Sequence, residues 1–266
     1  MRSRLAGGSA ISTDRRIGES AHFLRVIEQA GSCHPSCRVA MTAARIIRLF
    51  HMFKSDVFER TQAPTAEIGA SLYNFIIGAV LIWGFAVTAI VQSYFHHIQF
   101  GWPAAIGYIA GVFVGTLLAR STNPVLSLLG YHLVIVPTGV MLGPFVNALS
   151  PNVLQDTLFL TGGVTCAMMG LGTVFPRAFV RIGGALFIAL LALVVVGFVQ
   201  AIFIHRYYPL VDWIAAGIFS LYIAYDYARA QLIPKTVDNA IDVCIALYLD
   251  VINLFIRIAS LLSRRE

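Results

Sequence analysis

Charged residues are scarce in this sequence. Only 12% of its 266 residues are Asp, Glu, Lys or Arg, and 58% are hydrophobic, whereas soluble proteins carry about 25% charged residues. The mean hydropathy is +0.78. This composition excludes an ordinary soluble domain and indicates an integral membrane protein.

The motifs of common enzyme classes are also missing. The chain has no nucleotide-binding loop, no His-Glu-x-x-His metal motif and no recognisable Ser, His and Asp set for nucleophilic catalysis. We therefore expect no enzymatic activity.

Cysteines are few and do not form a disulfide framework. There are four. Cys33 and Cys37 flank a histidine but supply too few ligands for a structural zinc site. Cys166 and Cys244 fall in hydrophobic segments, where an unpaired thiol usually acts as a small apolar residue. We expect no resident cofactor.

Residues 1–66 form a polar tail that contains ten of the 19 basic residues. The tail lacks the apolar run of a secretory signal peptide. Its basic, acid-poor stretch permits a membrane-surface helix or an organelle transit peptide, but we expect a mostly disordered tail, with Met52 as an alternative start. The partner that this charge suits is a lipid surface rather than nucleic acid.

Hydrophobic segments follow one another from Leu72 onward. They are too long and too continuously apolar for barrel strands, so we expect seven transmembrane helices. Their expected bounds are 72–94, 103–119, 125–148, 153–174, 180–203, 210–227 and 239–262. The predicted fold class is an all-α polytopic membrane protein in which residues 67–266 form one seven-helix domain.

Basic residues between the segments predict the orientation. Five of them lie in connections on the side of the N-terminus: Arg120, Arg177, Arg181, Arg229 and Lys235. The positive-inside rule therefore predicts a cytoplasmic N-terminus. The arginines at 264–265 would then lie outside, which leaves open a re-entrant last helix that returns to the cytoplasm.

Small residues recur at helical spacing in two segments. Gly107, Gly111 and Gly115 repeat every four residues in the second, and Gly139 and Gly143 do so in the third, which also contains two prolines. Such faces let helices approach closely. We expect tight packing here, with a flexing, gate-like helix as the alternative.

Few ionisable residues are expected at membrane depth. They are Asp226, Asp238, Asp242, Asp250, Arg120 and His132. Each such group costs roughly 2.5 to 3.5 kcal/mol on insertion scales, so it needs a partner or a function.

Simple explanations exist for most of these residues. Asp238 and Asp242 either form the mouth of an ion path or are solvated at a helix N-terminus. Asp226 can form a salt bridge with Arg229 one turn away. A hydrogen-bonded core position suffices for His132. Asp250 has no such explanation.

Asp226 and Asp250 can face each other if the last two segments form an antiparallel hairpin. Each lies about twelve residues from Asp238, which is the centre of the connection. Two close carboxylates in a low dielectric cannot both stay ionised, so they should share a proton. Such a pair senses pH and, when deprotonated, offers oxygen ligands to Ca²⁺.

Three motifs in these segments are distinctive. They are Phe219-Ser-Leu-Tyr-Ile-Ala-Tyr-Asp226, Ile245-Ala-Leu-Tyr-Leu-Asp250-Val-Ile-Asn-Leu-Phe255 and Thr138-Gly-Val-Met-Leu-Gly-Pro144. Over about residues 70–266 the chain resembles the Bax inhibitor-1/YccA family, also called the transmembrane Bax inhibitor motif family.

The resemblance implies a fold and a function. Its bacterial members imply seven helices around a central one, an inner-membrane location and a pH-sensitive Ca²⁺ leak. Asp226 and Asp250 match the family's hydrogen-bonded dyad. Arg120 is the candidate for the arginine that latches it, although an ungapped register from the third-segment motif puts the matching position one residue later. Other relatives are implicated in regulating a membrane-bound protease or cell-death responses, so a non-conducting interaction protein is the alternative function.

Overall fold

The structure is a computed structural model that describes residues 67–95, 102–119, 121, 123–200 and 208–264. The chain divides into the units Met1–Arg60 and Thr61–Glu266, and every described residue belongs to the second. The expected disorder of residues 1–66 and the alternative start at Met52 lie outside the described residues and stay predictions.

Helices make up the described residues, which contain no strand. The helices are α3 (Ala70–Phe95), α4 (Trp102–Leu118), α5 (Pro124–Asn147), α6 (Pro151–Val174), α7 (Pro176–Arg181), α8 (Gly183–Val199), α9 (Pro209–Leu232) and α10 (Val237–Leu262). Seven of them lie where the sequence predicts a hydrophobic segment. The addition is α7, a six-residue helix that begins at Pro176, where proline is favoured because its missing N–H is not needed.

Four helices are long and apolar enough to cross a membrane, namely α3, α5, α6 and α10. The apolar helix α8 has 17 residues, about 26 Å at 1.5 Å per residue, whereas the hydrocarbon core is about 30 Å thick. The apolar part of α4, Ile106–Leu118, is shorter still. Since α9 carries three charged residues, the count of seven spans stays a prediction.

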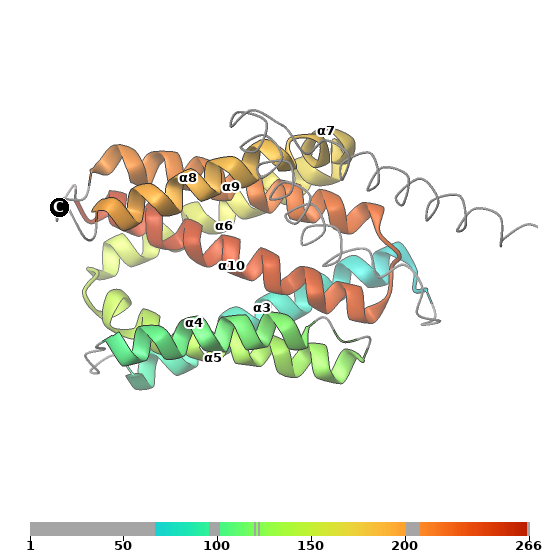
Figure 1. The fold of residues 1–266 in the computed structure, drawn as a ribbon, viewed down its shortest axis with the longest axis horizontal. Helices are drawn as coiled ribbons and strands as arrows, with labels where there is room; N and C mark the ends of the chain where they lie inside the picture. Colours follow the sequence, from blue (N-terminus) through green and yellow to red (C-terminus); the bar gives the residue numbers. More distant parts are fainter. Residues whose placement is uncertain (1–66, 96–101, 120, 122, 201–207, 265–266) are drawn as a thin grey trace, which may run out of the picture. The chain divides into compact units, whose positions relative to one another are not determined.

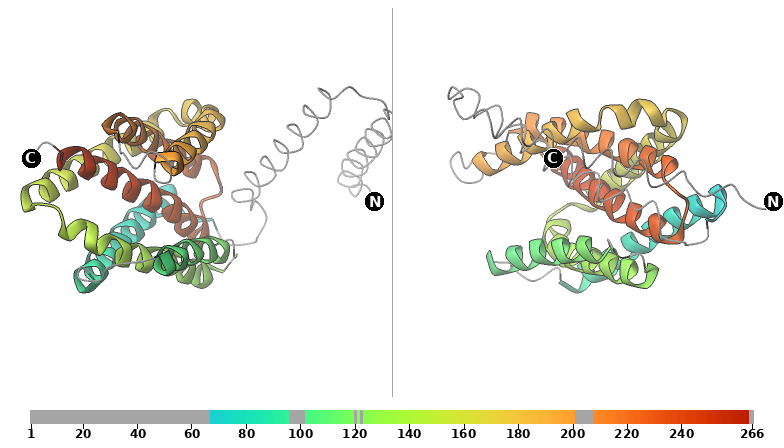
Figure 2. Two further views of the ribbon diagram at one scale, coloured as in Figure 1. Left: turned by 60° about the vertical axis from the view of Figure 1, so that its left-hand side comes forward. Right: turned by 45° about the vertical axis from the view of Figure 1, so that its right-hand side comes forward.

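Helix α10 joins two groups of helices, as Figures 1 and 2 show. It packs against α3 and α5 in one group and against α6 and α9 in the other. Fifteen of its 26 residues are buried, compared with five of the 26 residues in α3. This helix therefore occupies the central position that the family resemblance implies.

The helices α9 and α10 form an antiparallel hairpin. Their connection is short, and Thr236 caps α10 by accepting a hydrogen bond of 3.1 Å from the backbone of Asn239. A backbone hydrogen bond of 2.8 Å from Ile68 to Lys235 attaches the start of the domain to this connection. Because α10 continues for 26 residues without a break, about 39 Å, its length favours a crossing helix over a re-entrant one.

Glycines allow α5 to approach its two neighbours closely. A Cβ atom added to Gly130 would lie 2.5 Å from the carbonyl oxygen of Gly115 on α4, and one added to Gly139 would lie 3.0 Å from that of Thr88 on α3. The packing expected of Gly115 and Gly139 is therefore confirmed. The expectation for Gly107 is wrong within the part of the chain that the structure describes, where no atom lies within 4 Å of a Cβ added there.

Replacing Gly130 by alanine should destabilise the protein by about 1–3 kcal/mol, because the backbone carbonyl that the new methyl group meets cannot move aside without parting α4 from α5. The thermal midpoint of the detergent-solubilised protein measures this. Gly107→Ala is the matched control: its methyl group enters open space, and alanine favours the helix by up to about 1 kcal/mol. Equal midpoints for the two variants would contradict the close α4–α5 contact.

Candidate functional site

Asp226 on α9 and Asp250 on α10 lie opposite each other in the hairpin. We call them the aspartate pair. Both are buried, with 9% of each residue exposed. Their carboxyl groups interact electrostatically. The antiparallel hairpin brings them together although they are not equally distant from the connection: Asp226 lies six residues before the end of α9 and Asp250 thirteen residues after the start of α10. The expectation that the connection is centred at Asp238 is wrong, because Asp238 lies in the first turn of α10.

Aromatic residues of α9 surround the aspartate pair. Tyr222, one turn before Asp226, interacts electrostatically with both carboxyl groups. Tyr225 accepts a hydrogen bond of 3.2 Å from Arg229, whose guanidinium carbon lies 5.7 Å from the centre of the same ring. On the other carboxyl group, Oδ2 of Asp250 is buried without a hydrogen-bond partner. The pair therefore lies beside the hydroxyl groups of two tyrosines, and one oxygen of Asp250 has no hydrogen bond.

The aspartate pair alone does not form a resident metal site. In the described ranges, no group of three or more His, Cys, Asp or Glu side chains is placed to hold a metal ion. Ca²⁺ takes six to eight oxygen ligands, so most of its ligands at this pair would have to be carbonyl groups or water. The arrangement suits a passing cation that keeps part of its hydration shell.

Asp238, in the first turn of α10, is buried rather than solvated. Its Oδ1 accepts a hydrogen bond of 2.8 Å from Ser127 on α5. The same hydroxyl group lies 3.3 Å from the carbonyl oxygens of Ala119 and Ser121. The alternative that the helix terminus exposes Asp238 to water is wrong, because Ser127 covers it and links α10 to α5 and to the end of α4.

Asp242 lies one turn beyond Asp238. It interacts electrostatically with the ring hydroxyl of Tyr73 on α3 and with the thiol of Cys244. Cys244 itself is buried and donates to the carbonyl oxygen of Ile77 at 3.3 Å. Asp242 therefore faces α3, and its role at the mouth of an ion path stays a prediction, as does that of Asp238.

Two further candidates have different outcomes. Arg120, the candidate latch, lies outside the described residues, so its role stays a prediction. His132 is hydrogen-bonded as expected: Nε2 accepts from Trp83 at 3.1 Å, and Nδ1 lies 2.8 Å from the carbonyl oxygen of Leu128. A neutral ring with its proton on Nδ1 satisfies both contacts.

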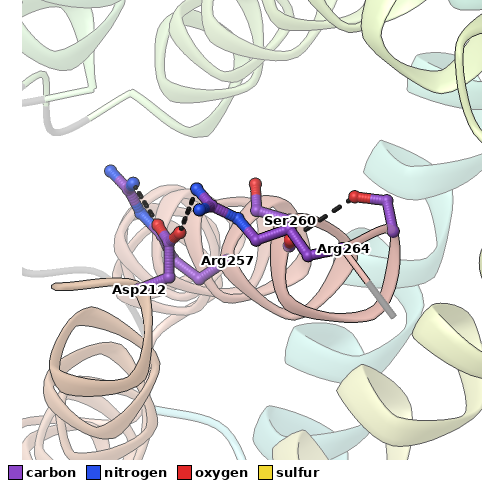
Figure 3. A network of polar contacts seen from close by, with 5 residues as sticks. Asp212, Arg257, Ser260 and Arg264 are labelled. Atoms are coloured by element: carbon purple, nitrogen blue, oxygen red, sulfur yellow. Dashed lines mark hydrogen bonds and ion pairs between the residues drawn. The ribbon is translucent and has the colours of Figure 1, made fainter. Parts of the chain in front are cut away.

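Sequence analysis missed a second charged group at the opposite end of the hairpin. Asp212, near the start of α9, lies between two guanidinium groups of the C-terminal segment (Figure 3). Its Oδ1 is 3.0 Å from Nη1 of Arg257, and its Oδ2 is 3.2 Å from Nη2 of Arg264. We call these three residues the Asp212 clasp.

The Asp212 clasp corrects two expectations. Asp212 and Arg257 were absent from the ionisable residues expected at membrane depth, and Arg264, which was expected only as part of a basic tail, forms an ion pair with Asp212. A signal did exist: Asp212 precedes Asp226 by fourteen residues, and Arg264 follows Asp250 by fourteen. The hairpin that pairs the aspartates therefore also pairs Asp212 with Arg264.

Comparisons with known proteins agree with the described fold. A sequence model of the family described as "Inhibitor of apoptosis-promoting Bax1" matches residues 67–266. Two similar proteins come from Helicobacter pylori, one from strain ATCC 700392 / 26695 and one from strain J99 / ATCC 700824. They are 28% and 27% identical to this chain over 199 residues, which is 72% of this chain and 84% of each relative. Both are described only as "Uncharacterized protein".

Replacing Asp212 by asparagine should lower the free energy of unfolding by about 1–3 kcal/mol. The change leaves two arginines close together without their shared carboxylate. The loss is smaller than for a fully buried ion pair because the arginine side chains are 33% and 38% exposed. Thermal unfolding in detergent measures it.

Asp156→Asn is the control for this change, because Asp156 is an exposed aspartate on α6. An Asp212→Asn protein as stable as the control would show that the clasp contributes nothing to the hairpin. Arg257→Gln should lower the free energy of unfolding less in the Asp212→Asn protein than in the unchanged protein, because both substitutions remove the same ion pair.

Proposed function

We propose, because the chain belongs to the Bax inhibitor-1 family, that it is a multi-pass membrane protein that lets Ca²⁺ leak through the bilayer under the control of the aspartate pair. The observation that carries the proposal is the contact between two buried carboxyl groups, Asp226 and Asp250, inside an apolar helical bundle. Family membership supports the membrane location, and the chemistry of the aspartate pair supports the pH-controlled Ca²⁺ leak.

A hydrogen bond between two carboxyl groups requires a proton on one of them. An ionised carboxylate only accepts hydrogen bonds, whereas a protonated one donates as well. When the shared proton leaves, two like charges face each other in a poorly polarisable interior and repel. Water or a cation must then enter between α9 and α10, so the pair couples proton loss to the opening of a polar path.

The proposal includes seven transmembrane spans, formed by α3, α4, α5, α6, α8, α9 and α10. Four of these satisfy the length and composition of a span by themselves. The charges of α9 do not argue against a crossing, since Asp212 and Asp226 both have partners on α10. We place the N-terminus in the cytoplasm of a bacterial cell and the protein in the inner membrane, following the positive-inside rule.

Arg120, Asp238 and Asp242 have secondary roles in this proposal. An arginine at the end of α4 can hold the aspartate pair charged when it approaches, which is the latch function. Asp238 and Asp242 continue the acidic face of α10 from the pair toward its N-terminal end. The contact of Ser127 with Asp238 supports a link between this face and the end of α4.

Flux measurements in liposomes test the proposal. The purified protein should release entrapped Ca²⁺ at a rate that changes with pH, by at most about tenfold per pH unit if one proton controls it. The double change Asp226→Asn and Asp250→Asn should remove this pH dependence, because an amide does not titrate in this range. A fluorescent Ca²⁺ indicator measures the flux, and Asp156→Asn is the control.

Two outcomes would contradict the proposal in different ways. An unchanged pH response in the double variant would show that the aspartate pair is not the sensor. No flux above that of empty vesicles would exclude conduction and favour the alternative, a protein that modulates a membrane-bound protease or a stress response. Co-purification with such a protease would then be the next measurement.

A further inference from the structure

Three threonines form a buried row on α6. Thr157, Thr161 and Thr165 are spaced four residues apart, and their exposed fractions are 0%, 4% and 7%. Residues at this spacing lie on one face of a helix. The helix α6 packs mainly against α9 and α10 and also touches α7, so we place the row against the hairpin that carries both charged groups.

The hydroxyl groups of Thr161 and Thr165 differ from those of the other threonines in the described helices. Six side chains donate a hydrogen bond to the backbone carbonyl four residues earlier, as is usual for these residues in helices. They are Thr88, Thr116, Thr138, Thr157, Thr173 and Ser220. The hydroxyl oxygens of Thr161 and Thr165 are buried and have no hydrogen-bond partner.

Two unpartnered hydroxyls on one buried face point to water. A buried polar group without a partner is unfavourable, and in native proteins such groups are usually satisfied by ordered water. Side chains four residues apart on a helix have Cβ atoms about 5–6 Å apart. One water molecule that hydrogen-bonds to both hydroxyls spans that distance, since each such bond is about 2.8 Å long.

The two hydroxyls lie at a depth between the aspartate pair and the Asp212 clasp. Gly172 of α6 lies against Ala224 and Ala228 of α9, which is the level of Asp226. The two helices run in the same direction (Figure 1). At 1.5 Å per residue, Thr165 and Thr161 lie about 10 and 16 Å from the level of Gly172, and Asp212 lies about 21 Å from that of Asp226.

We infer that Thr161 and Thr165 hold ordered water in the path between the aspartate pair and the Asp212 clasp, along which a proton or a hydrated cation moves. This inference rests on the proposed function, since it names the lining of the same path. A hydroxyl group suits that task because it both donates and accepts hydrogen bonds. The unpartnered Oδ2 of Asp250 is an acceptor for water at the other end of the path.

Valine substitutions test the inference through flux. Changing both Thr161 and Thr165 to valine keeps the shape and removes the two hydroxyls, so the Ca²⁺ flux should fall about tenfold while its pH dependence remains. Thr157→Val is the matched control, because that hydroxyl is already satisfied by the carbonyl oxygen of Val153 at 2.6 Å, and its flux should be unchanged.

A second measurement detects water without any flux. In a variant whose four native cysteines are replaced, Thr161→Cys and Thr165→Cys should react with a small cationic methanethiosulfonate reagent at least tenfold faster than Thr138→Cys. Thr138 is equally buried, with 2% exposed, but it lies on α5 and its hydroxyl bonds to its own helix. It therefore represents a dry position.

The outcomes separate this inference from the proposed function. Flux that is unchanged by the two valines, together with a raised thermal midpoint, would show that the hydroxyls are dry and would overturn the inference. Cysteines as unreactive as Thr138→Cys would also overturn it, even if the pH-dependent leak is present. Reactive cysteines in a protein without any flux would support the water site and refute the conduction proposal instead.

Discussion

The antiparallel register of α9 and α10 is the constraint on which the charged interior depends. Two helices in contact behave as rigid rods, so one fixed pair of opposing residues determines the others. Asp226 opposes Asp250, and fourteen residues further from the connection Asp212 opposes Arg264. A slip by one helical turn would break both contacts and would leave charged groups buried without partners, at a cost of several kcal/mol. Each contact therefore stabilises the register that the other needs.

Burial of α10 follows from the charges that it carries. Asp238, Asp250 and Arg257 lie at successive levels along this helix and are partnered by Ser127 on α5, by Asp226 on α9 and by Asp212 on α9. A helix with this many ionisable groups would be costly to expose to lipid. Its position between α3 and α5 on one side and α6 and α9 on the other shields these groups. On the side formed by α3 and α5, Gly130 lets α5 pack closely against Gly115 of α4, and Gly139 lets it pack closely against α3.

The sequence was sufficient for the parts of the fold that depend on local pattern. Long apolar runs located the helices. The prediction that Asp226 and Asp250 face each other assumed a connection centred at Asp238, whereas the structure places Asp238 in the first turn of α10. Properties that depend on a neighbouring helix were not predictable in this way. Gly107 belongs to the same four-residue repeat as Gly115, but no described atom lies near it. The sequence position of Asp238 suggests a solvated residue at a helix N-terminus, whereas in the structure Ser127 of α5 covers it. The unpartnered hydroxyls of Thr161 and Thr165 depend on side-chain rotation, which spacing alone does not determine. Asp212 was predictable in principle, because the arithmetic that pairs the two aspartates also pairs it with Arg264.

The Asp212 clasp and the aspartate pair differ in their charges: the clasp combines opposite charges, and the pair combines two acids. At the Asp212 clasp one carboxyl group faces two guanidinium groups. At the aspartate pair two acids face each other, and only a proton between them removes their repulsion. In the proposed function, loss of that proton would make the two carboxylates repel each other in the middle of the hairpin, while the opposite charges of the clasp attract each other. In the proposed function, α9 and α10 stay in contact at the clasp and separate at the aspartate pair. The hydroxyls of Thr161 and Thr165 lie at a depth between the pair and the clasp, where the further inference places ordered water.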